Sequence, residues 1–329
     1  MSCGAMGSFL LAQSIHDCSS IDLNIALRGT QYLPKEGIHQ QLSLHRLGLR
    51  AGFSRDKFAS RLFLAQIQTG GTQSYIGIDG ESTVLRVEMA DLRYQPWHFL
   101  QISTGIVEDL WIESETIDWK LRDLEKNLAE EYSWGTRGQI GASTLWIFPQ
   151  NFGHVVFSYT TGEGAYRRER NNGKNTTGLL QFYPLQSTLL GISLYGQEGS
   201  YGFDSARNHR AGGRLSSEWS TGHGGVSAIK AWGLQADIVD EPLLWTIWGS
   251  QRLRKEISGI ARAGQIRRET GTHLEVLTGI SYSPQPETGL WLGWKNIRAD
   301  RQTTGIAGTK ASQNQQQIFI QINGRLEVL

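Results

Sequence analysis

Residues Gln316 to Val328 read QQIFIQINGRLEV, and their side chains alternate in type from one residue to the next. The even-numbered positions from 318 onward carry Ile, Leu, Val and one Gly, whereas the odd-numbered positions after Phe319 carry Gln, Asn, Arg and Glu. Successive side chains of an extended strand point to opposite faces. This period of two therefore predicts a strand with one apolar and one mainly polar face.

The same alternation recurs along most of the chain, between short runs of Gly, Asn and Asp. The segment 254–270 carries several Arg, Lys and Glu residues and could be a loop or a weak pair of strands; it is counted as a loop. Bacterial single-chain barrels have even strand numbers, so the candidates predict fourteen or sixteen strands, with sixteen favoured. Strands are expected at 21–29, 40–53, 57–69, 83–92, 97–107, 137–148, 154–159, 177–184, 189–196, 209–219, 225–238, 243–253, 272–282, 290–297 and 316–328.

One expected strand changes phase part-way along. In the segment from Gln40 to Phe53, the apolar positions are even-numbered before His45 and odd-numbered after Arg46. Because a slip of one residue exchanges the two faces of a strand, this change predicts a bulge near His45 and Arg46.

Composition narrows the class of protein. The 329 residues include 32 Lys and Arg against 31 Asp and Glu, which argues against a nucleic-acid partner, because such proteins carry a basic excess. No apolar run is long enough for a transmembrane helix, so a membrane protein with this sequence must be a closed barrel. Trp and Tyr near the expected strand ends favour that barrel over a soluble sheet, because aromatic girdles flank the apolar band of such barrels; they are Trp97, Trp146, Tyr159, Trp219, Tyr282 and Trp294.

The predicted fold is all-β, a transmembrane antiparallel up-and-down β-barrel of 14–16 strands with one short helical loop insert. Residues 1–19 form an N-terminal segment, and 20–329 form a single barrel domain that contains the insert at 108–136. Residues Met1 to Gln13 have no basic n-region and do not resemble a secretion signal. Cys3 and Cys18 could pair in an oxidising compartment or stay free, and the sequence leaves both open.

The insert from Glu108 to Thr136 reads EDLWIESETIDWKLRDLEKNLAEEYSWGT and interrupts the strand pattern. Its apolar residues recur mostly at helical spacing, which predicts a helix of about three turns with Asp118 as its N-cap. The apolar series consists of Trp119, Leu121, Leu124, Leu128 and Tyr132.

If the insert folds inward, its charges would narrow the lumen and screen solutes by size and charge. The alternative is a loop outside the bore that packs its apolar face on the barrel rim. The candidate constriction residues are Glu113, Glu115, Asp118, Lys120 and Arg122 on the insert, with Arg86, Glu88 and Arg137 on the strands.

A second charged group lies in the expected loop from Gly162 to Asn175. Its basic residues are either a solvated surface or a site for lipopolysaccharide phosphates, since clustered Arg suits phosphate geometry. The cluster consists of Arg167, Arg168, Arg170 and Lys174.

The stretch from Leu85 to Tyr166 resembles the phosphate-selective-porin-like family of bacterial outer-membrane β-barrel proteins. The resemblance rests on LRVEMADLRYQPWHFLQISTGIVEDLW, on RGQIGAS after the insert, and on YTTGEGAYRRERNNGKNTTG. It implies an outer-membrane barrel with a pore and an inserted loop. It does not imply phosphate selectivity, because the basic residues expected in the lumen (Arg28, Arg86, Arg137, Arg214 and Arg325) are accompanied by Asp22, Glu88, Glu218 and Glu327.

The predicted function is an outer-membrane porin-like channel for passive diffusion of small hydrophilic solutes or ions. The alternative is a plugged structural or docking barrel, in which bulky inward residues such as Phe319 and Trp248 fill the bore. No GxSxG, HExxH, P-loop or CxxC motif occurs, so no enzyme, cofactor or metal site is expected. Expected partners are outer-membrane lipids and lipopolysaccharide, the barrel-insertion machinery through strand 316–328, and a homotrimer or another protein, with no nucleic acid.

Overall fold

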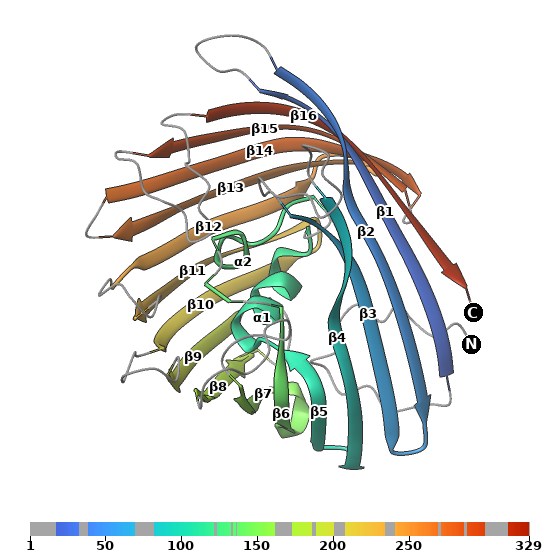
Figure 1. The fold of residues 1–329 in the computed structure, drawn as a ribbon, viewed down its shortest axis with the longest axis vertical. Coiled ribbons are helices and arrows are strands. Elements are labelled where there is room, and N and C mark those ends of the chain that lie inside the picture. The colour runs from blue at the N-terminus through green and yellow to red at the C-terminus, as the bar shows by residue number, and fades with distance from the viewer. Residues whose placement is uncertain are drawn as a thin grey trace.

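The computed structural model describes residues 18–32, 39–69, 82–121, 124–132, 134–135, 137–161, 173–185, 189–200, 208–233, 241–268, 271–285, 288–299 and 315–328. Sixteen strands run through these residues and form one closed barrel (Figure 1). They are β1 Cys18–Tyr32, β2 His39–Arg55, β3 Phe58–Thr69, β4 Ser82–Trp97, β5 Leu100–Glu108, β6 Gly138–Ile147, β7 Gly153–Thr160, β8 Asn175–Phe182, β9 Gly191–Gly199, β10 His209–Trp219, β11 Gly222–Trp232, β12 Leu243–Arg252, β13 Ile257–Arg268, β14 Gly271–Gln285, β15 Thr288–Ala299 and β16 Gln315–Val328.

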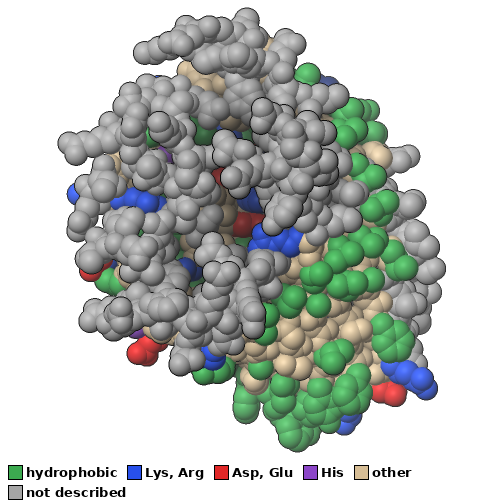
Figure 2. All heavy atoms as spheres, in the orientation of Figure 1, with side chains coloured by type: hydrophobic (Ala, Val, Ile, Leu, Met, Phe, Trp, Pro, Cys, Tyr) green, Lys and Arg blue, Asp and Glu red, His purple; other side chains and the backbone are tan. Residues whose placement is uncertain are grey.

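Every strand pairs antiparallel with its neighbours in sequence, and β1 pairs with β16 to close the ring, with Ile21 opposite Val328. The two faces of the wall differ as the alternation predicts. In β16, Ile318, Ile320 and Ile322 are exposed on the outside, whereas Phe319 is buried inside. Apolar side chains cover the outer surface at the right of Figure 2, over the strands β1–β4 of Figure 1. The prediction of an antiparallel up-and-down barrel is confirmed, with the favoured count of sixteen strands.

Two local predictions have different outcomes. The bulge expected near His45 and Arg46 is present, because Ala26 pairs with Arg46 while Leu27 pairs with Leu44. Of the two alternatives left open for 254–270, the loop that was used in the count is wrong, because Ile257–Arg268 forms β13. Its inner positions carry Ile260, Arg262 and Ile266, all buried, so one of the charges that suggested a loop lies inside the barrel, whereas Arg254, Lys255 and Arg267 are exposed.

The two rims of the barrel differ in their connections. Both termini of the strand series lie at one rim, where the described turns are short, as between β2 and β3 or β10 and β11. Short turns mark the periplasmic rim in outer-membrane barrels. Exposed aromatic side chains gather at this rim, as a girdle at a membrane boundary would; they are Phe53, Phe58, Tyr94, Trp97, Trp146, Phe182, Trp219 and Tyr282.

The connection between β5 and β6 folds into the ring of strands (Figure 1). It contains α1 Leu110–Trp119 and α2 Leu128–Glu131, and a 3₁₀ turn η1 Pro149–Asn151 follows between β6 and β7. None of the helices in the described residues is long and apolar enough to cross a membrane. The division into a segment 1–19 and a domain 20–329 stays a prediction, and Cys3 lies outside the described residues.

Candidate functional site

The helix in the insert begins earlier than the sequence predicts. Asp109, rather than Asp118, is the N-cap of α1, and its carboxylate accepts hydrogen bonds from the backbone N–H groups of Trp111 and Ile112, both at 3.1 Å. The helix ends where Lys120 takes a left-handed conformation, with φ of 57°. The predicted single helix of three turns from Asp118 is therefore wrong. Its apolar series is buried or half-buried, but on two separate helices and the segment between them.

An apolar layer holds α1 and α2 against the wall. Trp111, Ile112 and Leu128 are buried in a cluster with inward side chains from seven of the described strands between β6 and β13. The wall contributes Leu145, Val156, Leu179, Tyr195, Ile229, Ala231, Leu244 and Ile266. A wet lumen would favour polar residues at these positions, so this arc of the inner wall is shaped to receive the insert.

Two inward glycines give the helices room to approach. A Cβ atom at Gly212 would lie 3.1 Å from the indole of Trp111 and 2.8 Å from a backbone oxygen of β11. A Cβ atom at Gly264 would overlap a methyl group of Leu128 and lie 2.9 Å from the backbone oxygen of Trp245. Both helices therefore pack directly on the backbone of the wall.

A second apolar cluster continues this contact toward the last strands. Trp119 and Leu124 pack with Trp248, Phe319 and three further inward side chains of β13 to β15. The indole N–H of Trp119 donates to the backbone oxygen of Glu125 at 3.0 Å. Phe319 and Trp248, the residues expected to fill a plugged bore, are thus buried beneath the insert.

Ion pairs fix the charged side of α1. The guanidinium of Arg214 on β10 forms an ion pair with Asp118, at 2.6 Å, and donates a hydrogen bond to the hydroxyl of Ser114 at 3.1 Å. Glu115 accepts from the hydroxyl of Ser227 on β11 at 2.7 Å. Burial raises the pKa of Glu115, while the bond from Ser227 opposes that rise. Glu115 and Asp118 were predicted to face solutes, but they anchor the helix to the wall.

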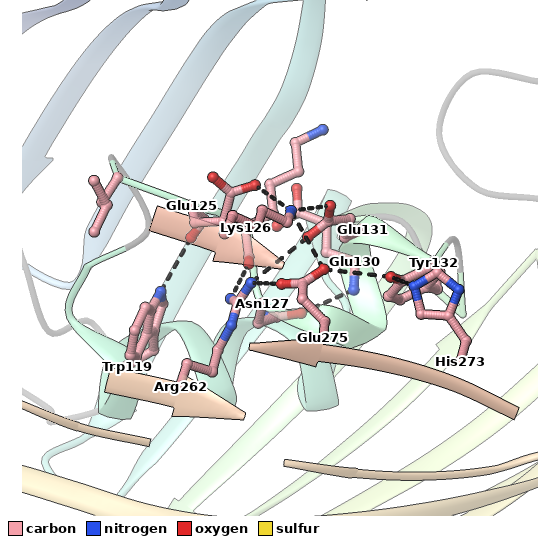
Figure 3. A network of polar contacts seen from close by, with 12 residues as sticks. Trp119, Glu125, Lys126, Asn127, Glu130, Glu131, Tyr132, Arg262, His273 and Glu275 are labelled. Carbon is pink, nitrogen blue, oxygen red and sulfur yellow. Dashed lines mark hydrogen bonds and ion pairs between the residues drawn. The ribbon is translucent and has the colours of Figure 1, made fainter. Parts of the chain in front are cut away.

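A buried network holds the segment around α2 (Figure 3). The ammonium of Lys295 on β15 lies 3.1 Å from Glu125, 2.6 Å from Glu131 and 3.3 Å from Glu275. Arg262 on β13 adds a bond to Glu275 at 2.6 Å and lies 3.6 Å from Glu131. Three carboxylates in one buried site would repel one another without these two cations, so the network requires both.

Polar contacts also join α2 to its neighbours. The side chain of Asn127 caps α2 by accepting from the N–H of Glu130 at 2.8 Å, and it donates to the backbone oxygen of Ile112 on α1 at 3.0 Å. Tyr132 donates to Glu275 at 3.3 Å and contacts the ring of His273. The two helices therefore dock as one unit.

Arg28 on β1, the strand that closes the barrel against β16, contacts the same unit. Its guanidinium donates to Glu125 at 2.9 Å and to Gln321 on β16 at 2.8 Å, and it lies 4.3 Å from the centre of the Phe319 ring. It also donates to the backbone oxygen of Leu124.

The start of the insert is held by a separate group of charges. Arg137 lies 3.2 Å from Glu113 and 3.5 Å from Glu88, with its guanidinium 4.6 Å from the centre of the Phe63 ring. The structure thus brings together three of the predicted constriction residues. It places them in an ion-paired cluster in which Glu88 and Arg137 are buried.

The remaining predicted residues lie in different settings. Lys120 is exposed and pairs with Glu218 at 2.8 Å, and Arg86 is half-buried on β4. Arg122 lies outside the described residues, as do Arg167, Arg168 and Arg170. Lys174 is half-buried just before β8, and its proposed contact with lipopolysaccharide stays a prediction.

Sequence reasoning missed several of the cations inside the barrel. Arg28, Arg86, Arg137, Arg214 and Arg325 were expected there, but at least five more basic side chains lie on the described inner wall. Each occupies an inward position of an alternating strand, and that parity could have revealed them. They are Arg61, Arg93, Arg210, Arg262 and Lys295.

Burial raises the pKa of Glu131 to about 7, and the nearby carboxylates of Glu275 and Glu125 add to the rise while Lys295 and Arg262 oppose it. The pKa of Glu131 is higher in the docked state than its ordinary value of 4.5, so protonation of Glu131 stabilises docking. This stabilisation is complete below pH 4.5 and is lost as the pH rises through about 7. Hydrogen exchange at the amides of 128–132, corrected for intrinsic rates, should therefore be slower at pH 5.5 than at pH 8. A Glu131→Gln variant should lose this dependence, and faster exchange at pH 5.5 in the native chain would contradict the assignment.

No protein-family model and no curated protein matches the sequence. Solved structures match across most of the chain. An anion-selective porin from Comamonas acidovorans superposes with a TM-score of 0.66 at 11% identity, covering 94% of this chain and 100% of that one. The fold is that of outer-membrane porins. Salmonella typhi OmpF, in complex with daunomycin, matches with a TM-score of 0.67 at 7% identity over 94% and 98% of the two chains. The outer-membrane protein OmpT of Vibrio cholerae, in a trimer form, gives 0.61 at 10% identity over 94% and 100%.

Proposed function

We propose that this protein is a porin-like channel of a bacterial outer membrane, which lets small hydrophilic solutes or ions diffuse passively. The observation that carries the proposal is an insert folded inside a sixteen-stranded barrel and fastened along its inner wall by two apolar clusters and buried ion pairs. A fixed insert narrows the bore without a moving part. The fold of the porins and the exposed apolar outer surface support the membrane location.

In this proposal the filter differs from the one that the sequence suggests. At least five described carboxylates of the insert contact side chains of the wall, namely Glu113, Glu115, Asp118, Glu125 and Glu131. The side chains that the insert leaves exposed include Lys120 and Lys126. Solutes would pass between the insert and the inner faces of β2 to β5. Size selection then follows from the docked position of the insert, and charge selection from its exposed lysines and the half-buried Arg86.

A plugged scaffold is the second candidate function. The burial of Phe319 and Trp248 with Trp119 favours it, because bulky side chains fill that part of the bore. Outer-membrane lipids, the insertion machinery acting on β16, and a homotrimer like the trimer form of the Vibrio protein remain proposed partners for either function.

A cysteine scan in planar bilayers distinguishes the two functions. In a background with Cys3 and Cys18 replaced by Ser, Lys126→Cys should show stepwise conductance that a charged thiol reagent reduces by about half or more. The matched control is Ala129→Cys, on the same insert but fully buried, which the reagent should leave unchanged. A channel that is silent before labelling would exclude the porin and favour the scaffold. Conductance that the reagent leaves unchanged at Lys126→Cys would show that solutes do not pass the insert there.

A further inference from the structure

The outer face of β12 and β13 carries an open groove. Its volume is about 730 Å³, within the range of roughly 300–1,000 Å³ typical of small-molecule sites. The floor consists of small outward residues, Gly249, Gly259 and Ala261, and pairing places Gly249 beside Ala261 on the neighbouring strand. Taller side chains border it, namely Trp219 on β10 and Ile280, Leu292, Trp294 and Ile318 on β14 to β16.

One end of the groove lies beside a basic turn. Gln251 lines the groove, β12 ends at Arg252, and the turn that follows carries Arg254 and Lys255; all three cations are exposed. Leu253 connects the two features, because its Cδ1 lies 3.6 Å from the position of a Cβ atom at Gly259. Within the described part of the chain, the structure pairs none of these three cations with an acid. The turn itself contains one acid, Glu256, so its net charge is positive.

The position of the turn between β12 and β13 determines which part of a lipid it would contact. The turn between β12 and β13 lies at the rim that holds the start of β1 and the end of β16, near the girdle residues Trp219 and Tyr282. At this boundary of the membrane, an apolar groove would contact lipid acyl chains, and a cationic turn would contact lipid headgroups. If the groove were empty, the side chains that line it would lack van der Waals contacts on one side. A flexible methylene chain in the groove would supply these contacts.

We propose that this groove and turn form a binding site for one anionic glycerophospholipid, with its phosphate on Arg252, Arg254 and Lys255 and one acyl chain along Gly249, Gly259 and Ala261. Charge complementarity selects this occupant over a second copy of the chain, which would have to bring an acidic surface to the turn. The site lies on the outer face, away from the bore, so it does not depend on whether the channel is open.

Native mass spectrometry in detergent tests the headgroup site with phosphatidylglycerol and phosphatidylcholine of identical acyl chains. The native chain should retain phosphatidylglycerol about tenfold more tightly, because the cationic turn attracts its net negative headgroup and not the zwitterionic headgroup of phosphatidylcholine. The variant Arg254→Gln/Lys255→Gln should lose this preference. The matched control is Arg55→Gln/Lys57→Gln, at the end of β2 and in the turn to β3, which removes two exposed cations from the same rim and should keep the preference.

The groove is tested by filling it. Gly249→Leu/Gly259→Leu should weaken retention of both lipids, and both positions accept a Cβ atom at ordinary contact distances of 3.6 Å or more. Gly196→Leu is the control, because that exposed outward glycine has no atom within 4 Å of its Cβ position. A lipid preference that persists in Arg254→Gln/Lys255→Gln, or retention unchanged by groove filling, overturns the proposal. A change of oligomeric mass with unchanged lipid retention assigns the face to a second copy. Bilayer conductance of the same variants reports separately on the channel.

Discussion

Replacing Lys295 by Glu will release the segment around α2 from the wall. The ammonium group is buried and lies within 3.3 Å of three carboxylates. Lys295→Glu would therefore place four acids together, with Arg262 and Arg28 as the cations that still pair with them among the described residues. Breaking a buried ion pair costs about 3–5 kcal/mol, which predicts that exchange at amides 124–132 accelerates by more than about a hundredfold. Hydrogen–deuterium exchange in micelles measures this, with the strand amides as an internal reference for the intact barrel.

The control for this reversal is Lys230→Glu, which breaks an exposed pair with Glu241 at 2.9 Å. Exposed pairs contribute about 0–1 kcal/mol, so exchange in the insert should change by less than a few-fold. Lys295→Met keeps the stem volume without the charge and should lie between the two. Unchanged exchange in Lys295→Glu would show that the apolar clusters alone hold the insert.

The second large effect is expected from Gly264→Val. Its side chain would occupy the space of a Leu128 methyl group and approach the backbone oxygen of Trp245, so α2 cannot keep its docked position. Overpacking of this kind costs typically about 1–3 kcal/mol. Exchange at amides 128–132 should rise about tenfold or more, and the noise of the open channel should increase.

Two further variants make the result specific. Adding Leu128→Ala to Gly264→Val should restore part of the protection, because it removes the side chain that the valine meets. Gly249→Val places the same side chain on the outer face, where the nearest heavy atom lies 3.7 Å from the Cβ position, and should leave the insert protected. If both glycine variants behaved alike, strand flexibility rather than helix packing would explain the loss.

The sequence predicts the strands and the outer face of the barrel better than its inner face and the docked insert. Period-two alternation identifies strand faces because lipid on one side imposes a uniform apolar surface, as at Ile318 and Ile320. The inner face obeys no such uniform rule. It is apolar at Leu179 and Leu244, where α1 and α2 dock, and charged at Arg262, where α2 needs a counter-ion. These positions depend on contacts across the bore, which local periodicity does not encode.

The insert illustrates the same limit. Asp109 and Asp118 are both plausible N-caps by residue type, and the helical spacing after Asp118 favours the second. The structure selects Asp109 because Gln139 on β6 also bonds its carboxylate, at 2.8 Å, where the insert leaves β5. Asp118 is needed elsewhere, as the partner of Arg214. The inward position of the insert was one of two alternatives that the sequence left open, and its register on the wall could not be predicted.

Arg28 gives the barrel a link between assembly and function. It lies on the first strand, bonds Gln321 on the last strand, and bonds Glu125 in the insert, so the seam of the barrel and the docked insert share one residue. The last strand also supplies Phe319 to the cluster around Trp119. The binding surface for the insert is therefore complete only after β1 and β16 have paired. A chain whose seam is still open would hold its insert incompletely, so the filter would acquire its final shape as the last step of assembly.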